Sequence, residues 1–96
     1  MAKKKLPTLD QYLRDQRLAQ GYSQKYVADS LGYSSAQFIS NWERGLASPP
    51  LDALSKLTRL LSLSETLLID IILSETRRNI ELSLAVKPRR TRKKTS

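Results

Sequence analysis

Polar side chains that can read the edges of base pairs are concentrated in residues 35–44. Gln37 and Asn41 carry amide groups that can form paired hydrogen bonds with adenine, and Arg44 suits guanine or phosphate. In a helix, these side chains and Ser40 fall within an arc of about 100° that contains no acid. The spacing therefore predicts a helix with one short, polar face that is suited to the major groove of DNA.

The opposite side of this helix belongs to a hydrophobic core. Ile39 and Trp42 lie about 60° apart on it, away from the polar arc. Hydrophobic residues make up 40% of the 96-residue chain, which is enough for one small core. Leucine dominates them and favours helices over strands, so we expect an all-α fold.

Two helices are predicted before residue 35. The first spans residues 8–20, with Thr8 as its cap and Gly21 as its left-handed stop. The second lies between its cap Ser23 and Gly32. The side chains that these helices bury recur at helical spacing: Leu9, Leu13, Arg17, Val27, Ala28 and Leu31.

Two further helices follow. The third is expected to start at a capping box formed by Ser34 and Gln37 and to end at Gly45. The turn at Ser48-Pro49-Pro50 starts a fourth helix. Four leucines form its apolar stripe: Leu51, Leu54, Leu57 and Leu61.

A fifth helix is predicted after its cap Ser64, and its end is open to two interpretations. A heptad-like apolar rhythm from Ile69 to Leu84 favours a helix of about 21 residues. Residues 80–86 also alternate with period two, but a lone strand needs a partner strand from another chain. We favour the helix. Either interpretation leaves apolar side chains beyond the compact domain, so residues 68–86 are the expected homodimer surface.

Basic residues are concentrated at the two ends of the chain. The formal net charge is +8, from 17 Lys and Arg against 9 Asp and Glu. Residues 1–7 contain three Lys and residues 87–96 contain six Lys or Arg, without acids, which leaves residues 8–86 at −1. We expect two disordered basic tails that attract an anionic partner.

Several classes of protein are excluded by composition. The chain contains neither cysteine nor histidine, which excludes disulfides, thiol nucleophiles and His-dependent catalytic triads. Because the carboxylates are scattered, we expect no enzyme activity, metal site, cofactor or small-molecule ligand. No apolar run reaches the ~18 residues of a membrane span, and no apolar segment follows the basic start. A cytoplasmic, nucleoid-associated protein is therefore predicted.

The segment from Tyr22 to Gly45, YSQKYVADSLGYSSAQFISNWERG, resembles the helix-turn-helix of Cro/C1-type phage repressors and bacterial Xre-like regulators. The resemblance extends over about residues 9–73. The matching residues are specific as an ordered set: Leu13, Arg17, Ser23, Gln24, Val27, Ala28, Leu31, Gly32, Ile39, Ser40, Trp42, Glu43, Arg44, Gly45, Pro49, Leu51 and Leu54. The resemblance implies a five-helix, lambda-repressor-like domain whose third helix enters the major groove.

The resemblance also implies roles for individual residues. The positions that reach base edges correspond to Ser35, Ala36, Gln37, Ser40 and Asn41. The positions that contact the DNA backbone correspond to Gln24, Arg44 and Ser48. Arg17 and Glu43 match a pair that commonly forms an internal salt bridge between the first and third helices. In the basic C-terminal tail, our candidates for further phosphate contacts are Arg89, Arg90 and Arg92.

Two features depart from the family pattern. The turn near Tyr33 is one residue longer than the commonest family spacing. Trp42 stands where the family usually has Ile or Leu, and we expect it in the core.

The sequence therefore predicts a basic tail (1–7), a helix-turn-helix domain (8–73), an extension that serves dimerisation (74–86) and a second basic tail (87–96). The expected function is sequence-specific binding of double-stranded DNA by a dimeric transcriptional regulator, most simply a repressor, with residues 35–44 as the recognition helix. Two alternatives stay open. One is a protein-interaction module, such as an antitoxin-like or polymerase-binding adaptor, and the other is a non-specific nucleoid-type DNA binder.

Overall fold

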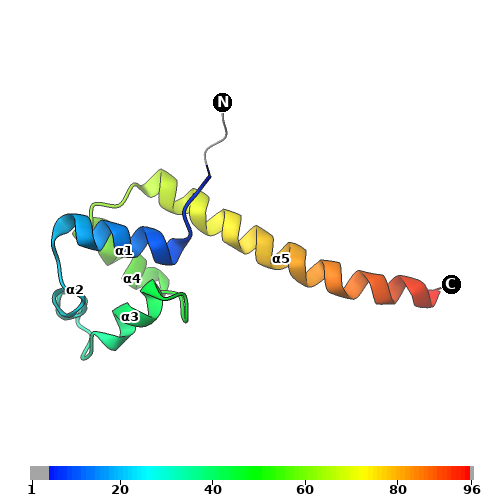
Figure 1. Ribbon diagram of the computed structural model, residues 1–96, viewed down its shortest axis with the longest axis horizontal. Helices are drawn as coiled ribbons and strands as arrows, with labels where there is room; N and C mark the ends of the chain where they lie inside the picture. The colour runs from blue at the N-terminus through cyan, green and yellow to red at the C-terminus, as the bar shows by residue number, and fades with distance from the viewer. Residues whose placement is uncertain (1–4, 96) are drawn as a thin grey trace.

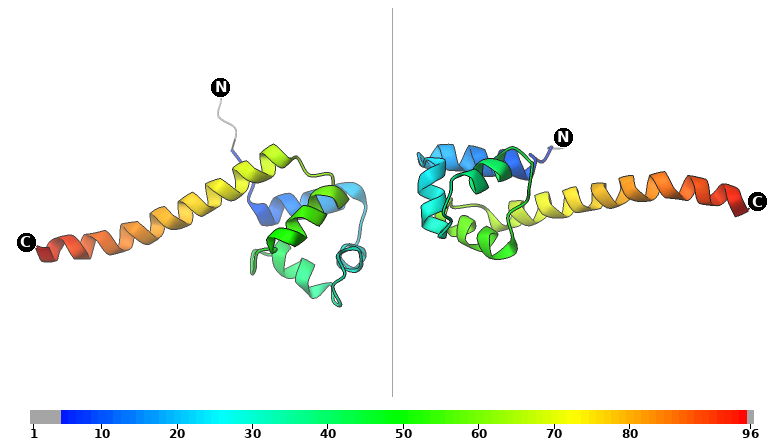
Figure 2. Two further views of the ribbon diagram at one scale, coloured as in Figure 1. Left: turned by 180° about the vertical axis from the view of Figure 1, so that it is seen from behind. Right: turned by 90° about the horizontal axis from the view of Figure 1, so that it is seen from below.

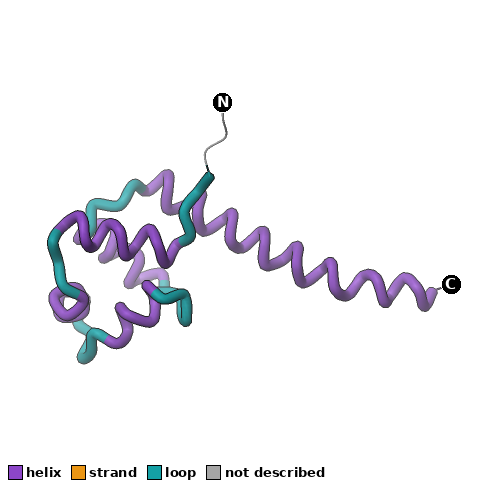
Figure 3. The backbone as a smooth tube through the Cα atoms, viewed as in Figure 1, coloured by secondary structure: helices purple, strands orange, loops and turns teal. Residues whose placement is uncertain are grey.

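The computed structural model describes the backbone of residues 5–95 and the side chains of residues 5–85. Its five helices are α1 (Leu9–Gln20), α2 (Gln24–Leu31), α3 (Gln37–Glu43), α4 (Leu51–Leu60) and α5 (Glu65–Thr95). The described residues contain no strand (Figure 3). Helices α1 to α4 and the start of α5 form one globule, from which the rest of α5 projects (Figure 1). The all-α, five-helix prediction is confirmed.

Local signals in the sequence determine the bounds of α2. Gly21 and Gly32, which follow α1 and α2, adopt left-handed conformations with φ of 78° and 84°. Ser23 Oγ accepts a hydrogen bond from the N–H of Tyr26 at 2.9 Å, so this predicted cap is confirmed. A cap of this kind satisfies one of the backbone donors that a helix start leaves unpaired.

The start of α1 is capped from a distant part of the chain. Thr8 is the N-cap residue, as predicted, and has the extended backbone of that position, but its side chain makes no capping hydrogen bond. The N–H of Leu9 instead donates to Glu75 Oε2 of α5 at 2.8 Å. The Tyr12 hydroxyl accepts a second long-range bond, from the N–H of Ser64 at 2.9 Å. These two bonds fasten the start of α5 to α1.

The third helix starts later than the predicted capping box places it. The N-cap of α3 is Ala36, and the hydroxyl that accepts from the Gln37 N–H, at 3.0 Å, belongs to Ser35 rather than Ser34. The lengthened turn after Gly32 shifts the helix start toward the C-terminus. The recognition helix is therefore residues 37–43, shorter than the expected 35–44.

All five helices contribute to the core. Side chains that are at most 2% exposed include Val27, Ile39, Leu57, Leu61 and Ile71. Trp42 is also buried, as expected. Leu51 is 82% exposed, so its assignment to the core is wrong. It is the first residue of α4, and Ala53 and Leu54 take the inward positions of that turn.

The fifth helix is longer than expected. Its 31 residues span about 46 Å at 1.5 Å per residue, and the predicted cap Ser64 accepts from the Leu67 N–H at 3.2 Å. The helical interpretation of residues 80–86 is confirmed and the strand interpretation is wrong. The backbone of residues 87–95, which were predicted as a basic tail, continues α5. Lys and Arg are good helix formers that extend an existing helix.

The projecting helix makes the molecule elongated (Figure 2). Its radius of gyration is 17.0 Å, against about 12–13 Å expected for a compact chain of this length. Among the helices described, none combines the length and the apolar character that a bilayer crossing needs. Residues 1–4 of the predicted N-terminal tail lie outside the described residues, as do the side chains of Arg89, Arg90 and Arg92.

Candidate nucleic-acid interface

The recognition helix α3 buries one side and presents the other to solvent. Its buried side chains are Ile39, Trp42 and Glu43. Gln37 is exposed, and Ser40 and Asn41 are half-buried. The two faces expected from the helical spacing are therefore both present.

The two amide side chains on the exposed face contact each other. Gln37 Nε2 donates to Asn41 Oδ1 at 3.0 Å, which an i, i+4 spacing on a helix permits. This bond leaves the Gln37 Oε1 acceptor and the Asn41 Nδ2 donor for a ligand. An acceptor and a donor side by side complement the N6 donor and N7 acceptor of adenine.

Two of the predicted base-reading residues lie before α3 rather than on it. Ser35 is exposed, and its hydroxyl already accepts the Gln37 N–H described above. Ala36 is half-buried at the N-cap position. Both border the start of the recognition helix, which is the end that meets base edges in helix-turn-helix proteins.

A buried ion pair fixes the far end of α3. Arg17 Nε donates to Glu43 Oε2 at 2.6 Å and Arg17 Nη2 donates to Glu43 Oε1 at 3.0 Å. Arg17 Nη1 also donates to the carbonyl oxygen of Tyr22 at 2.8 Å. Gln24 Nε2 donates to Glu43 Oε1 at 3.0 Å, so the residue predicted to contact the DNA backbone also braces α3. The network ties α3 to α1 and α2.

The loop after α3 carries the other predicted backbone contacts, Arg44 and Ser48, and both are exposed. Gly45 in this loop has φ of 75° and passes close to the start of α1. A Cβ at this glycine would lie 3.1 Å from Asp10 Oδ2. The left-handed conformation therefore favours glycine, and a larger residue would also have to displace the Asp10 side chain slightly.

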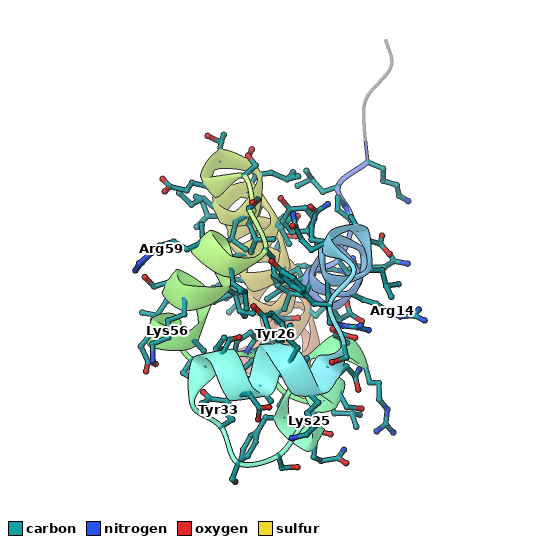
Figure 4. All side chains as sticks on the ribbon, turned by 90° about the vertical axis from the view of Figure 1, so that its left-hand side faces the viewer. Arg14, Lys25, Tyr26, Tyr33, Lys56 and Arg59 are labelled. Atoms are coloured by element: carbon teal, nitrogen blue, oxygen red, sulfur yellow. The ribbon has the colours of Figure 1, made fainter. Side chains whose placement is uncertain are left out.

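Several exposed side chains near α2 and α3 had no role in the sequence analysis. The basic side chains of Arg14, Lys25, Lys56 and Arg59 point outward around α2 (Figure 4). Phe38 of α3, the residue after Gln37, is a large apolar side chain and is nevertheless 47% exposed. Its position between the polar arc and Trp42 on the helix is the sequence signal that could have indicated its exposure. Among the described residues, no group of three or more acidic side chains is placed to hold a metal ion.

Comparison with known proteins agrees with this geometry. The helix-turn-helix family model matches residues 13–68, which is more than half of the chain. The match runs from α1 to the start of α5, and the five-helix architecture is compatible with a lambda-repressor-like fold. Searches of curated proteins and of solved structures gave no significant match. With α2 and α3 as its helix-turn-helix, the chain belongs to the Cro/C1-type, Xre-like helix-turn-helix family of DNA-binding regulators.

Proposed function

We propose that the protein binds double-stranded DNA at specific sequences and represses transcription by occupying them. The observation that carries this proposal is the exposed Gln37–Asn41 amide pair on α3. The pair lies on a helix whose other side is anchored in the core and by the buried Glu43 carboxylate. A rigidly held reading helix loses little conformational entropy when it enters the major groove.

In this proposal Gln37 and Asn41 do most of the base reading, and Ser35, Ala36 and Ser40 adjust the fit around them. Gln24, Arg44 and Ser48 hold the DNA backbone beside the recognition helix. Residues 8–86 have a net charge of −1, so non-specific attraction must come mainly from the basic ends. Arg89, Arg90 and Arg92 of the C-terminal end supply phosphate contacts, and the protein acts in the cytoplasm on nucleoid DNA.

The α5 stripe is the proposed homodimer surface within residues 68–86. We define it as Ile69, Leu73, Thr76, Ile80 and Leu84, which lie along one side of the helix and are all exposed. It lies on the side of α5 away from Ile71, which is buried in the core. Exposed apolar side chains that continue along a projecting helix mark an interaction surface. A dimer would read two half-sites about one turn of DNA apart.

The test is selection of bound sites from a random duplex library by the full-length protein at about 150 mM salt. Enrichment of a two-fold symmetric site is the expected result. Enrichment of an unsymmetric site would support base reading and contradict the proposed dimer. The Gln37→Ala/Asn41→Ala double variant is the control, and it should lose the enriched sequence while it keeps its helical fold.

A second candidate function has one observation in its favour. The α5 stripe also suits a different protein, so the domain would then serve as an antitoxin-like or polymerase-binding adaptor. Selection that enriches no site, with DNA binding that disappears when residues 87–96 are removed, favours this adaptor. Salt-dependent binding of all duplexes without enrichment instead identifies a nucleoid-type binder.

A further inference from the structure

Phe38 is a large apolar side chain that the hydrophobic core does not use. It is 47% exposed and lies about 100° around α3 from Gln37. This position borders the polar reading face on one side and the buried Trp42 on the other. When α3 lies in the major groove, this position brings Phe38 to the edge of the face that meets the bases.

Edge-to-face aromatic contacts support Phe38. Its ring centroid is 4.9 Å from that of Tyr33, with an interplanar angle of 65°. Tyr33 is in turn 5.5 Å from the ring of Trp42, at 68°. Tyr33 comes from the lengthened turn between α2 and α3, at the lower edge of α2 in Figure 4. The extra turn residue thus provides a support for Phe38 that reaches back to the core.

The chemistry of the major groove restricts what such a side chain recognises. Among the groups that base pairs present there, the 5-methyl group of thymine is the apolar one, and phenylalanine is among the side chains that contact it. The other groups are hydrogen-bond donors and acceptors, which a phenyl ring cannot satisfy. A half-exposed phenyl ring next to an amide pair that suits adenine therefore favours thymine at a neighbouring position.

We propose that Phe38 is a specificity-determining residue that packs on the 5-methyl group of one thymine in the recognised site. This inference rests on the proposed DNA-reading function and adds a base preference to it. Tyr33 is a positioning residue that holds the phenyl ring in place.

The experiment uses the site that the full-length protein selects. Each thymine is replaced singly by deoxyuridine, which removes the methyl group and leaves base pairing unchanged. The wild type is expected to bind about fourfold more weakly at one position, since burial of one methyl group accounts for a change of that size. Phe38→Ser is expected to bind the thymine and uracil duplexes equally, and Phe38→Leu to keep most of the preference.

Leu46→Ser is the matched control because Leu46 is also an exposed apolar residue, 63% exposed, just after α3. It should retain the wild-type ratio of thymine to uracil binding. The inference is overturned if the wild type shows no thymine preference at any position, or if Phe38→Ser keeps the preference. The uracil series on the wild type needs no variant, so the absence of a thymine preference overturns the inference even if Phe38→Ser unfolds. Failure to select any site contradicts the proposed function itself, whereas a selected site without a methyl preference contradicts only the role of Phe38.

Discussion

Glu43 places a carboxylate in the interior at the end of α3, where Arg17 and Gln24 donate three hydrogen bonds to it. A buried charge is tolerated when it is paired, and the loss of one partner leaves the other uncompensated. We therefore expect Glu43→Ala to lower the free energy of unfolding by roughly 3–5 kcal/mol, measured by urea denaturation.

The chain offers a control for this measurement in a solvent-exposed ion pair. Arg77 Nε lies 3.0 Å from Glu81 Oε2. Glu81→Ala should change stability by at most about 0.5 kcal/mol, because exposed i, i+4 pairs contribute little. A similar small effect of Glu43→Ala would mean that the buried pair is not what holds α3 in place.

Substitution of Gln37 tests the base-reading role of a single residue. We expect Gln37→Ala to cost roughly 1–3 kcal/mol in binding, confined to one base position of the selected site. Arg44→Ala should instead weaken binding to all sequences and reduce the slope of log affinity against log salt by about 1. Equal losses on every sequence for Gln37→Ala would remove its assigned role. Quantitative binding to a panel of single-base variants separates the two behaviours.

At the scale of helices, Ser23 and Thr8 provide a matched pair. Both have the extended backbone of an N-cap, but only Ser23 accepts a hydrogen bond with its side chain. Ser23→Ala is therefore expected to destabilise the domain by about 1 kcal/mol, and Thr8→Ala by much less. Thermal unfolding of the two variants is the measurement. Equal losses would show that the Glu75 carboxylate does not replace the Thr8 cap.

Local signals predicted the helices well, and features that depend on distant residues were harder to predict. The Ser23 and Ser64 caps, the glycine stops after α1 and α2 and the two faces of α3 are set within a few residues, so the sequence displays them directly. The cap that Glu75 provides to Leu9 joins residues 66 positions apart, which no local pattern records. The exposure of Leu51 likewise depends on where neighbouring helices lie.

The candidate site was predictable to a similar extent. The polar arc around Gln37 follows from helical spacing alone, and the Arg17–Glu43 pair follows from the family resemblance. The contact between Gln37 and Asn41 requires a choice of side-chain rotamers that spacing does not determine. The edge-to-face contact between Phe38 and Tyr33 depends on the path of the lengthened turn.

At the scale of the whole molecule, the α5 stripe predicts how the protein associates. Ile80→Lys introduces a charge within the stripe, so it should shift the protein toward monomer in sedimentation equilibrium. Leu82→Lys is the control, since Leu82 is similarly exposed but lies on the side of α5 that Ile71 shares. A dimer that survives Ile80→Lys and dissociates with Leu82→Lys would locate the interface on the other side of the helix.

The basic end of α5 gives a second prediction at this scale. Removal of residues 87–96 takes away six of the 17 basic residues while it leaves the globule intact. We expect weaker binding to all sequences alike and a flatter salt dependence, by about 0.9 in log–log slope for each phosphate that the basic end neutralises. Binding isotherms at several salt concentrations measure this slope. An unchanged slope would show that the basic end does not touch DNA.

Because α5 is continuous, the direction of its basic end is determined relative to the globule. Because Glu75 binds α1 and the helix continues without interruption, everything beyond residue 75 keeps a fixed rotation relative to the globule. Each residue turns an α-helix by about 100°, so deletion of two residues would swing the basic end through about 200°. Deletion of seven would return it to nearly the same azimuth, about 10 Å closer to the globule. The number of residues between Glu75 and the basic end therefore determines both the distance and the direction of the basic end relative to the globule.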